Sequence, residues 1–431
     1  MTVRGAALLG IGAMVGAGIF ALLGEAGAVA GAATWISFLL AGIVSVLIGY
    51  NVVKLGVRYP SSGGLFAYLL EGFGNGRLLG ISAWLGYMSA VLIVCSMCAV
   101  SFGDYAVSLF VSDNGWDGWD NVFTSAVVVA MALVVILGPK LVARAQSLIV
   151  FIMVGILGIF VAVTLPSIDL DKLAFSGYPP VSDIVASVAL TFFAYLGFSV
   201  ITFAAGDMRD PARDLPKAMN RALAVTTLVY VLVALSVFGT LTVAQVVQYG
   251  PTAIAEAGRP ALGDAGFTMI AVAAMVGMAG SVVATLYASG GLTGMLSDVG
   301  QFPPFFGRGS RLGAKSGVLI SAAVVLVVAN TVNLSAIASV GSACSLMIFV
   351  LVGVAGYRLR AETKALAPVI LVGIGATLVV LAFFVVDTFR NAPQTFVAIV
   401  VIAALSVALD LLWKRARGPL QEVPPEAAAQ G

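Results

Sequence analysis

Residues 10–20 form a stretch whose backbone could bind a small ligand. They read GIGAMVGAGIF and place four glycines inside a long uncharged segment. Glycine weakens a helix, so these glycines indicate either close packing of two helices or a helix that opens. An opened helix would expose carbonyl oxygens near residues 11–14 and the N–H groups of a half-helix that begins near Gly16. The carbonyls suit an ammonium group and the N–H groups suit a carboxylate, so the stretch could bind an α-amino acid zwitterion.

A second stretch of this kind lies at residues 191–199, which read TFFAYLGFS. It places a glycine between aromatic residues in another uncharged segment. The first stretch falls in the first predicted membrane span and the second in the sixth, which starts on the opposite side of the membrane. Paired interruptions in two such halves indicate a transporter with inverted repeats. Gly12-x-x-x-Gly16 alone would indicate helix packing, but the second stretch favours an opened backbone.

A membrane must position these stretches. Hydrophobic residues make up 61% of the 431 residues, charged residues only 10%, and the mean hydropathy is +1.09. A soluble domain carries roughly 25% charged residues. Uncharged runs, bounded by charges and by Gly, Pro and Asn clusters, predict an all-α polytopic membrane protein with twelve transmembrane helices. The predicted spans are 5–24, 33–53, 78–103, 119–138, 145–166, 184–206, 218–240, 264–296, 316–332, 335–357, 366–386 and 393–413.

Basic residues indicate the orientation. All but three of the 22 Lys and Arg residues fall on the same side of the predicted membrane as the N-terminus, and the exceptions are Lys172, Arg259 and Arg390. The positive-inside rule therefore predicts a multi-pass protein of the cell membrane with both termini in the cytoplasm. The predicted regions are a first repeat at 1–170 (helices 1–5), a second repeat at 171–360 (helices 6–10), helices 11 and 12 at 361–415, and a disordered cytoplasmic tail at 416–431.

The residue types argue against an enzyme. The chain contains no histidine, so imidazole cannot act as a base or a metal ligand. The predicted spans contain no nucleophile–base set, no carboxylate pair and no set of metal ligands. Cys95 and Cys98 form an isolated pair that makes a poor zinc site. We expect no catalytic residues, no cofactor, no metal and no nucleic-acid partner.

Four motifs carry a family resemblance. They are GAMVGAGIF from residue 12, FFAYLGF from residue 192, DPARDLPKA from residue 210 and GQFP from residue 300. In this order and spacing they resemble the amino acid–polyamine–organocation (APC) superfamily of transporters. The resemblance covers roughly residues 5–360. It implies a five-plus-five inverted repeat with discontinuous helices 1 and 6, followed by two C-terminal helices, that works by alternating access.

The resemblance also implies a substrate site. The first motif would hold the substrate backbone, Phe193 would cover the substrate, and its neighbours would contact the amino group and the side chain. The implied substrate-binding residues are Met14, Gly16, Ala17, Gly18, Phe193, Ala194 and Leu196.

Two positions depart from the family pattern. Ala17 stands where many members have Ser or Thr, and Met153 stands where several proton-coupled relatives have a lysine. Proton symport by the lysine route is therefore disfavoured, which leaves exchange, facilitated diffusion or a bound cation. Hydroxyl residues at i, i+4 spacing along the eighth span, with Ser281 and Thr285 as candidate cation ligands, indicate either an ion site or ordinary helix packing. The stripe continues through Ser289, Thr293 and Ser297.

We therefore expect a secondary transporter of neutral L-amino acids that works in the lipid bilayer as a monomer. A cationic or acidic substrate would need a buried counter-charge in the cavity, and the sequence offers no candidate for one: Asp104 and Asp410 lie near the ends of their spans. An amino acid exchanger or a uniporter is an alternative within the same class. A channel or sensor built on a transporter scaffold is an alternative of another class, and flux measurements separate it from a transporter.

Overall fold

The computed structural model describes residues 2–111, 118–309, 316–331, 334–391 and 393–417. These residues form helices and short connections, without a β-strand among them. The α-helices are α1 (Val3–Ala30), α2 (Thr34–Arg58), α3 (Leu65–Phe73), α4 (Arg77–Gly86), α5 (Val94–Phe110), α6 (Trp119–Ile136), α7 (Pro139–Thr164), α8 (Val181–Phe193), α9 (Val200–Phe203), α10 (Pro211–Thr240), α11 (Val243–Tyr249), α12 (Ala253–Asp298), α13 (Ser316–Thr331), α14 (Leu334–Arg358), α15 (Arg360–Thr363), α16 (Ala367–Asn391) and α17 (Pro393–Arg417). One π-helical segment, η2 (Tyr87–Ile93), joins α4 to α5, and the short 3-10 helices are η1 (Gly31–Ala33), η3 (Leu165–Ser167), η4 (Leu170–Leu173), η5 (Phe175–Gly177), η6 (Leu196–Ser199), η7 (Ala205–Asp207), η8 (Gly250–Thr252) and η9 (Pro304–Phe306).

The helices agree with a polytopic membrane protein. Within the described residues, nine helical segments are long and apolar enough to cross a membrane, or ten if one bent pair counts as a span. The first segment contains both α1 and α2, because Gly31 turns the chain between them with φ 55° and ψ −139°. A similar turn at Gly263, with φ 62° and ψ −150°, divides α12 one residue before the predicted start of the eighth span.

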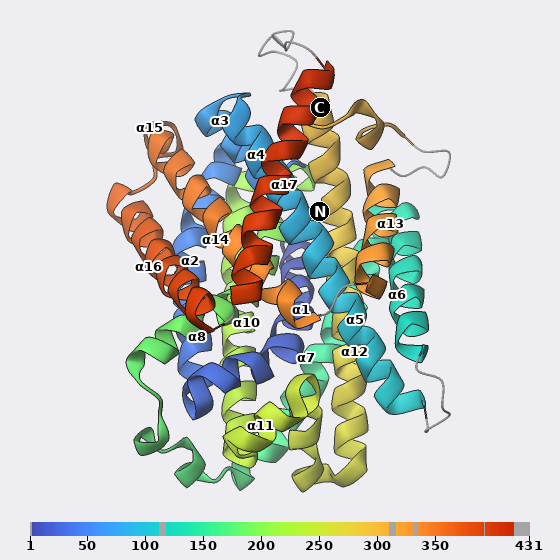
Figure 1. The fold of residues 1–431 in the computed structure, drawn as a ribbon, viewed down its shortest axis with the longest axis vertical. Helices are drawn as coiled ribbons and strands as arrows, with labels where there is room; N and C mark the ends of the chain where they lie inside the picture. The colour runs from blue at the N-terminus through green and yellow to red at the C-terminus, as the bar shows by residue number, and fades with distance from the viewer. Residues whose placement is uncertain (1, 112–117, 310–315, 332–333, 392, 418–431) are drawn as a thin grey trace.

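The helices run side by side along the long axis of the molecule, as Figure 1 shows. The short helices α3 and α15 and the end of α17 lie at one end of the bundle, and α11 lies at the other. The turn predicted near residue 332 falls outside the described residues, but helices α13 and α14 flank it as expected. The predicted tail also lies outside the described residues from residue 418 onward.

Helix α1 lies among the other helices. It packs against α7, α8, α10 and α12. In the α1–α2 segment, 88% of the most apolar stretch of 18 residues is buried. In the C-terminal helices α16 and α17, only 28% and 17% of the corresponding 18-residue stretches are buried, although both helices are strongly apolar. An exposed apolar helix is stable in lipid, so α16 and α17 have the surface of lipid-facing helices.

The structure corrects the prediction of a discontinuous helix 1. Helix α1 is continuous from Val3 to Ala30, and no residue inside it leaves the helical conformation. Its glycines serve close packing instead. A Cβ on Gly16 would overlap the backbone carbonyl of Gly277 in α12. The packing interpretation of Gly12-x-x-x-Gly16 is therefore the correct one in this structure.

The predicted interruption of helix 6 is present. Helix α8 ends at Phe193, and η6 and α9 continue the span after a bend of 40°. The residues that leave the α-helix, Ala194 and Tyr195, fall inside the stretch that the sequence singled out. The break lies against α1, since η6 contacts α1 directly.

Candidate functional site

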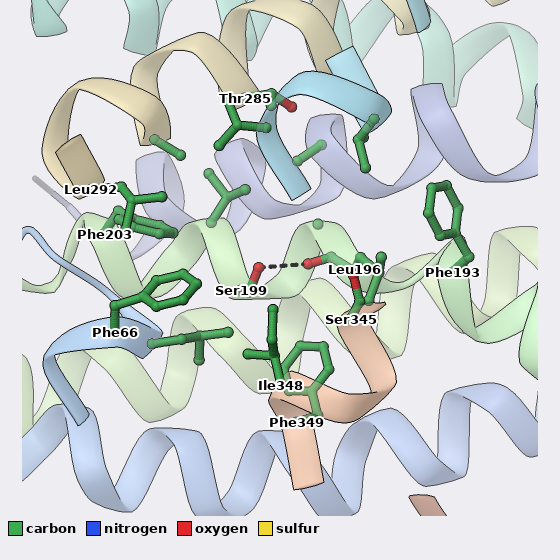
Figure 2. Close-up of a pocket in the computed structure, with 17 residues that line it drawn as sticks. Phe66, Phe193, Leu196, Ser199, Phe203, Thr285, Leu292, Ser345, Ile348 and Phe349 are labelled. Carbon is green, nitrogen blue, oxygen red and sulfur yellow. Dashed lines mark hydrogen bonds between the residues drawn. The ribbon is translucent and has the colours of Figure 1, made fainter. Parts of the chain in front are cut away.

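A cavity of about 60 Å³ lies at the break after α8. Phe193, Leu196 and Gly197 supply the break side of its wall, and Ala13 supplies the contribution of α1. Figure 2 shows Phe66 and Phe203 toward one end of the cavity and Phe193 toward the other. The remaining wall comes from α3, η2, α5, α12 and α14. Six segments of the chain therefore meet at the break of the sixth predicted span: α1, α3, η2 with α5, the broken span itself, α12 and α14.

The lining is apolar apart from three hydroxyl groups, on Ser199, Thr285 and Ser345. No charged side chain is among the described residues that line the cavity. The hydroxyl of Ser199 donates to the carbonyl of Leu196 at 2.8 Å, which satisfies one backbone group that the break frees (Figure 2). Ser345 is 4% exposed, and its Oγ has no hydrogen-bond partner among the described residues. A buried hydroxyl of this kind is available to a bound ligand.

Sequence reasoning missed the π-helical segment η2. It provides Val91 to the cavity wall, and Val94 follows directly after it. π-Helical turns are rare and occur often at functional sites, because they shift the register of the side chains that follow. No glycine, proline or charge marks this segment in the sequence, so no local signal could have revealed it.

The predicted substrate residues divide into two groups. Phe193 and Leu196 line the cavity, and the candidate cation ligand Thr285 lines it as well. Met14, Gly16, Gly18 and Ala194 do not line it. Ala17 lies in the same continuous helix as the other predicted α1 residues.

The carbonyl groups of α1 are occupied by side chains of other helices. The hydroxyl of Ser281 in α12 lies 3.1 Å from the carbonyl oxygen of Gly12 and 3.3 Å from that of Ala13. The hydroxyl of Tyr230 in α10 donates to the carbonyl of Met14 at 2.6 Å. These side-chain bonds keep the carbonyls satisfied while the helix stays intact.

The candidate coupling residues lie beside this junction. Met153 is fully buried, and its sulfur lies against Gly277. Two turns before Met153 in α7 lies Gln146, which sequence reasoning missed. Gln146 is 1% exposed, and its side-chain amide donates to the carbonyl of Gly280 at 2.6 Å. Its Oε1 lies where a Cβ on Gly12 would sit, and it has no hydrogen-bond partner among the described residues.

The rest of the hydroxyl stripe of α12 is engaged in local bonds. Ser289 donates to the carbonyl of Leu286 and Thr293 to that of Ser289, each at 2.7 Å. Ser297 bonds to the carbonyl of Pro303 at 3.3 Å. These three hydroxyls satisfy the backbone of their own segment, which is the packing interpretation of the stripe.

Tyr195 and the cysteines lie away from the cavity wall. The hydroxyl of Tyr195 donates to the carbonyl of Phe38 in α2 at 2.9 Å, and the residue is fully buried. Cys95, Cys98 and Cys344 are free and buried. Within the described part of the chain, no group of three or more His, Cys, Asp or Glu residues could hold a metal ion.

Comparisons with known proteins agree with this architecture. A family model described as amino acid permease matches residues 2–408. The inner membrane transport protein YbaT of Escherichia coli (strain K12) is 29% identical over 407 residues, which are 94% of each chain. The branched-chain amino acid permease BcaP of Bacillus subtilis (strain 168) is 27% identical and matches 55% of this chain and 54% of its own. The serine/threonine exchanger SteT of the same organism is also 27% identical, over 63% of this chain and 61% of its own.

The match to the family extends over nearly the whole chain, and the relatives named above are transport proteins. The described residues form the helical bundle of apolar spans that such a protein requires. The chain therefore belongs to the amino acid permease family of the APC superfamily: it is a membrane protein that transports amino acids, and it is not an enzyme.

Proposed function

We propose that this protein is a secondary transporter of neutral L-amino acids that binds its substrate in the cavity at the α8 break. The observation that carries the proposal is the chemistry of the lining. Apolar side chains and three hydroxyl groups surround the cavity, and its described lining contains no charged side chain. A cationic or acidic substrate side chain would be buried there without a counter-charge, which is strongly unfavourable. Backbone groups at the break would contact the charged ends of the zwitterion.

The size of the cavity supports a cycle with conformational change. A volume of about 60 Å³ is far below the roughly 300–1,000 Å³ that ligand sites usually have. Substrate entry therefore needs the surrounding helices to separate. We keep Met14, Gly16, Ala17 and Gly18 as substrate-binding residues of a state in which the α1 stretch has moved away from α12. Alternating access supplies such a state.

The helix contacts support the inverted repeat. Helix α1 packs against α10 and α7, and α8 packs against α2 and α14. In an inverted repeat, each of the first five spans corresponds to one of the second five. The contact of α1 with α10 then corresponds to that of α8 with α2, and the contact of α1 with α7 corresponds to that of α8 with α14. The proposed repeats are 1–170 and 171–360, with α16 and α17 outside them. Both termini would lie in the cytoplasm.

The coupling residues favour exchange over proton symport. The position that carries a lysine in proton-coupled relatives is the apolar Met153, and Ser281 bonds to the backbone of α1. One relative, SteT, is named as a serine/threonine exchanger. Two other coupling modes compete with exchange. One is uniport, and the other is coupling to a cation that binds near Gln146 Oε1 and Ser281.

Uptake into proteoliposomes tests the proposal. Vesicles loaded with an unlabelled neutral amino acid should accumulate the labelled amino acid from outside by counterflow, and other neutral amino acids should compete. A proton gradient imposed on empty vesicles should not drive uptake. Preferential competition by arginine or glutamate would contradict the substrate class. Flux that neither saturates nor shows counterflow would indicate a channel.

A further inference from the structure

One hydroxyl group connects the two stretches that the sequence singled out. Tyr230 of α10 is fully buried. Its Oη lies 2.6 Å from the carbonyl oxygen of Met14 in α1 and 2.9 Å from that of Ala194 at the α8 break. The ring is held by edge contacts with Tyr195 and tilted packing on Phe38, each at a centroid distance of 5.1 Å.

The two carbonyls differ in what else can satisfy them. Met14 lies in a continuous helix, where its carbonyl also faces an N–H group one turn later. Ala194 lies where the chain leaves the helix, and its carbonyl accepts a hydrogen bond from the Tyr230 hydroxyl. A carbonyl freed inside a membrane protein needs such a donor. The Tyr230 hydroxyl therefore stabilises the break.

A glycine makes this arrangement possible. A Cβ on Gly18 would overlap the Tyr230 hydroxyl and would lie 2.7 Å from the Cβ of Ala194. The absence of a side chain at Gly18 lets α1, the break and the phenol meet at one point. Ala194 lies next to Phe193 and two residues before Leu196, both of which line the cavity. The position of Ala194 relative to α1 therefore sets the shape of the cavity wall.

We propose that Tyr230 is a positioning residue of the substrate site, whose hydroxyl ties α1 to the α8 break. A phenol carries one proton, so it can donate fully to only one of the two carbonyls at a time. When a substrate ammonium group donates a hydrogen bond to the Ala194 carbonyl, the Tyr230 hydroxyl donates its proton to the Met14 carbonyl instead. This assignment rests on the proposed function, because it needs an amino acid whose ammonium group reaches the break.

The experiment compares Tyr230→Phe with Tyr195→Phe. Tyr195 is a matched control, because it is equally buried, packs edge-on against the Tyr230 ring and donates its hydroxyl to one backbone carbonyl, that of Phe38. Each variant loses one buried hydroxyl and keeps its ring. The measurements are the KM and maximal rate of counterflow in proteoliposomes, and amide hydrogen exchange of residues 10–20.

We expect Tyr230→Phe to raise KM about 5- to 10-fold, the effect of one net hydrogen bond, with little change in maximal rate per folded transporter. Exchange of residues 10–20 should become faster. Tyr195→Phe should change neither quantity. Gly18→Ala, which displaces the hydroxyl without removing it, should act in the same direction as Tyr230→Phe.

Equal KM shifts in the two tyrosine variants, or unchanged exchange of residues 10–20 in Tyr230→Phe, would overturn the assignment. Absence of counterflow in the wild type would instead contradict the proposed function. The amide hydrogen exchange measurement needs no substrate. It therefore tests whether Tyr230 links α1 to the α8 break even if the wild type shows no counterflow.

Discussion

Gly16 of α1 lies directly against the backbone of Gly277 of α12, so closely that a Cβ on Gly16 would overlap the Gly277 carbonyl. The contact brings the carbonyls of Gly12 and Ala13 within reach of the Ser281 hydroxyl. It therefore holds α1 in its continuous, closed form. In the proposed cycle, the site residues proposed on α1 would contact substrate only after this contact separates.

The first prediction concerns this contact. Gly16→Ala should lower the free energy of unfolding by about 1–3 kcal/mol, because the added methyl group would overlap the Gly277 carbonyl. Denaturant titration in detergent measures the change. Gly155→Ala in α7 is the control, since a Cβ there meets no atom within 4 Å. It should be neutral or stabilising by up to about 1 kcal/mol, because alanine favours a helix. Equal destabilisation by both variants would contradict the account.

The second prediction concerns the unpartnered hydroxyl of Ser345. Ser345→Ala should leave thermal stability unchanged or raise it, because it removes a buried hydroxyl that makes no bond. It should raise the KM of counterflow by about 3- to 10-fold if the hydroxyl bonds to the substrate. Ser342→Ala is the matched control, because its hydroxyl is also buried and unpartnered on α14 but does not line the cavity. Its KM should match the wild type, and a KM equally raised in both variants would argue against direct contact.

The third prediction concerns a buried ion pair on α17. Asp410 is fully buried, and its carboxylate lies 2.8 Å from the ammonium group of Lys414. Lys414→Met would leave the carboxylate buried without its partner, so it should destabilise the protein by about 3–5 kcal/mol. Asp410→Asn in the same chain should recover a large part of this loss. A double-mutant cycle measured by unfolding in detergent gives both values, and simple additivity of the two changes would show that the pair does not interact.

The sequence predicted the spans well, because the bilayer makes hydropathy a strong one-dimensional signal. The turn at Gly263 fell one residue before the predicted start of the eighth span for this reason. The break after α8 was also predicted, since glycine between aromatic residues has no obvious role in a continuous span. Phe193 and Leu196 followed from the motif that contains them.

The remaining features depend on contacts between distant segments. The glycines of α1 are compatible with both an open and a closed helix, and only the fit of Gly16 against Gly277 decides between them. Tyr230 and Ser345 are single polar residues in apolar helices, and their roles arise from which carbonyl or cavity the fold brings to them. No local pattern distinguishes such residues from ordinary packing.

The most direct test fills the cavity at the α8 break. Ala288 of α12 lines the cavity and is 5% exposed, so Ala288→Leu should occupy the space proposed for the substrate. Val272→Leu, on the exposed surface of the same helix, is the control. The account predicts that Ala288→Leu loses counterflow of neutral amino acids, and loses the rise in melting temperature that they cause, while it melts near the wild-type temperature without substrate. Undiminished counterflow with unchanged KM in Ala288→Leu would contradict the placement of the substrate in this cavity.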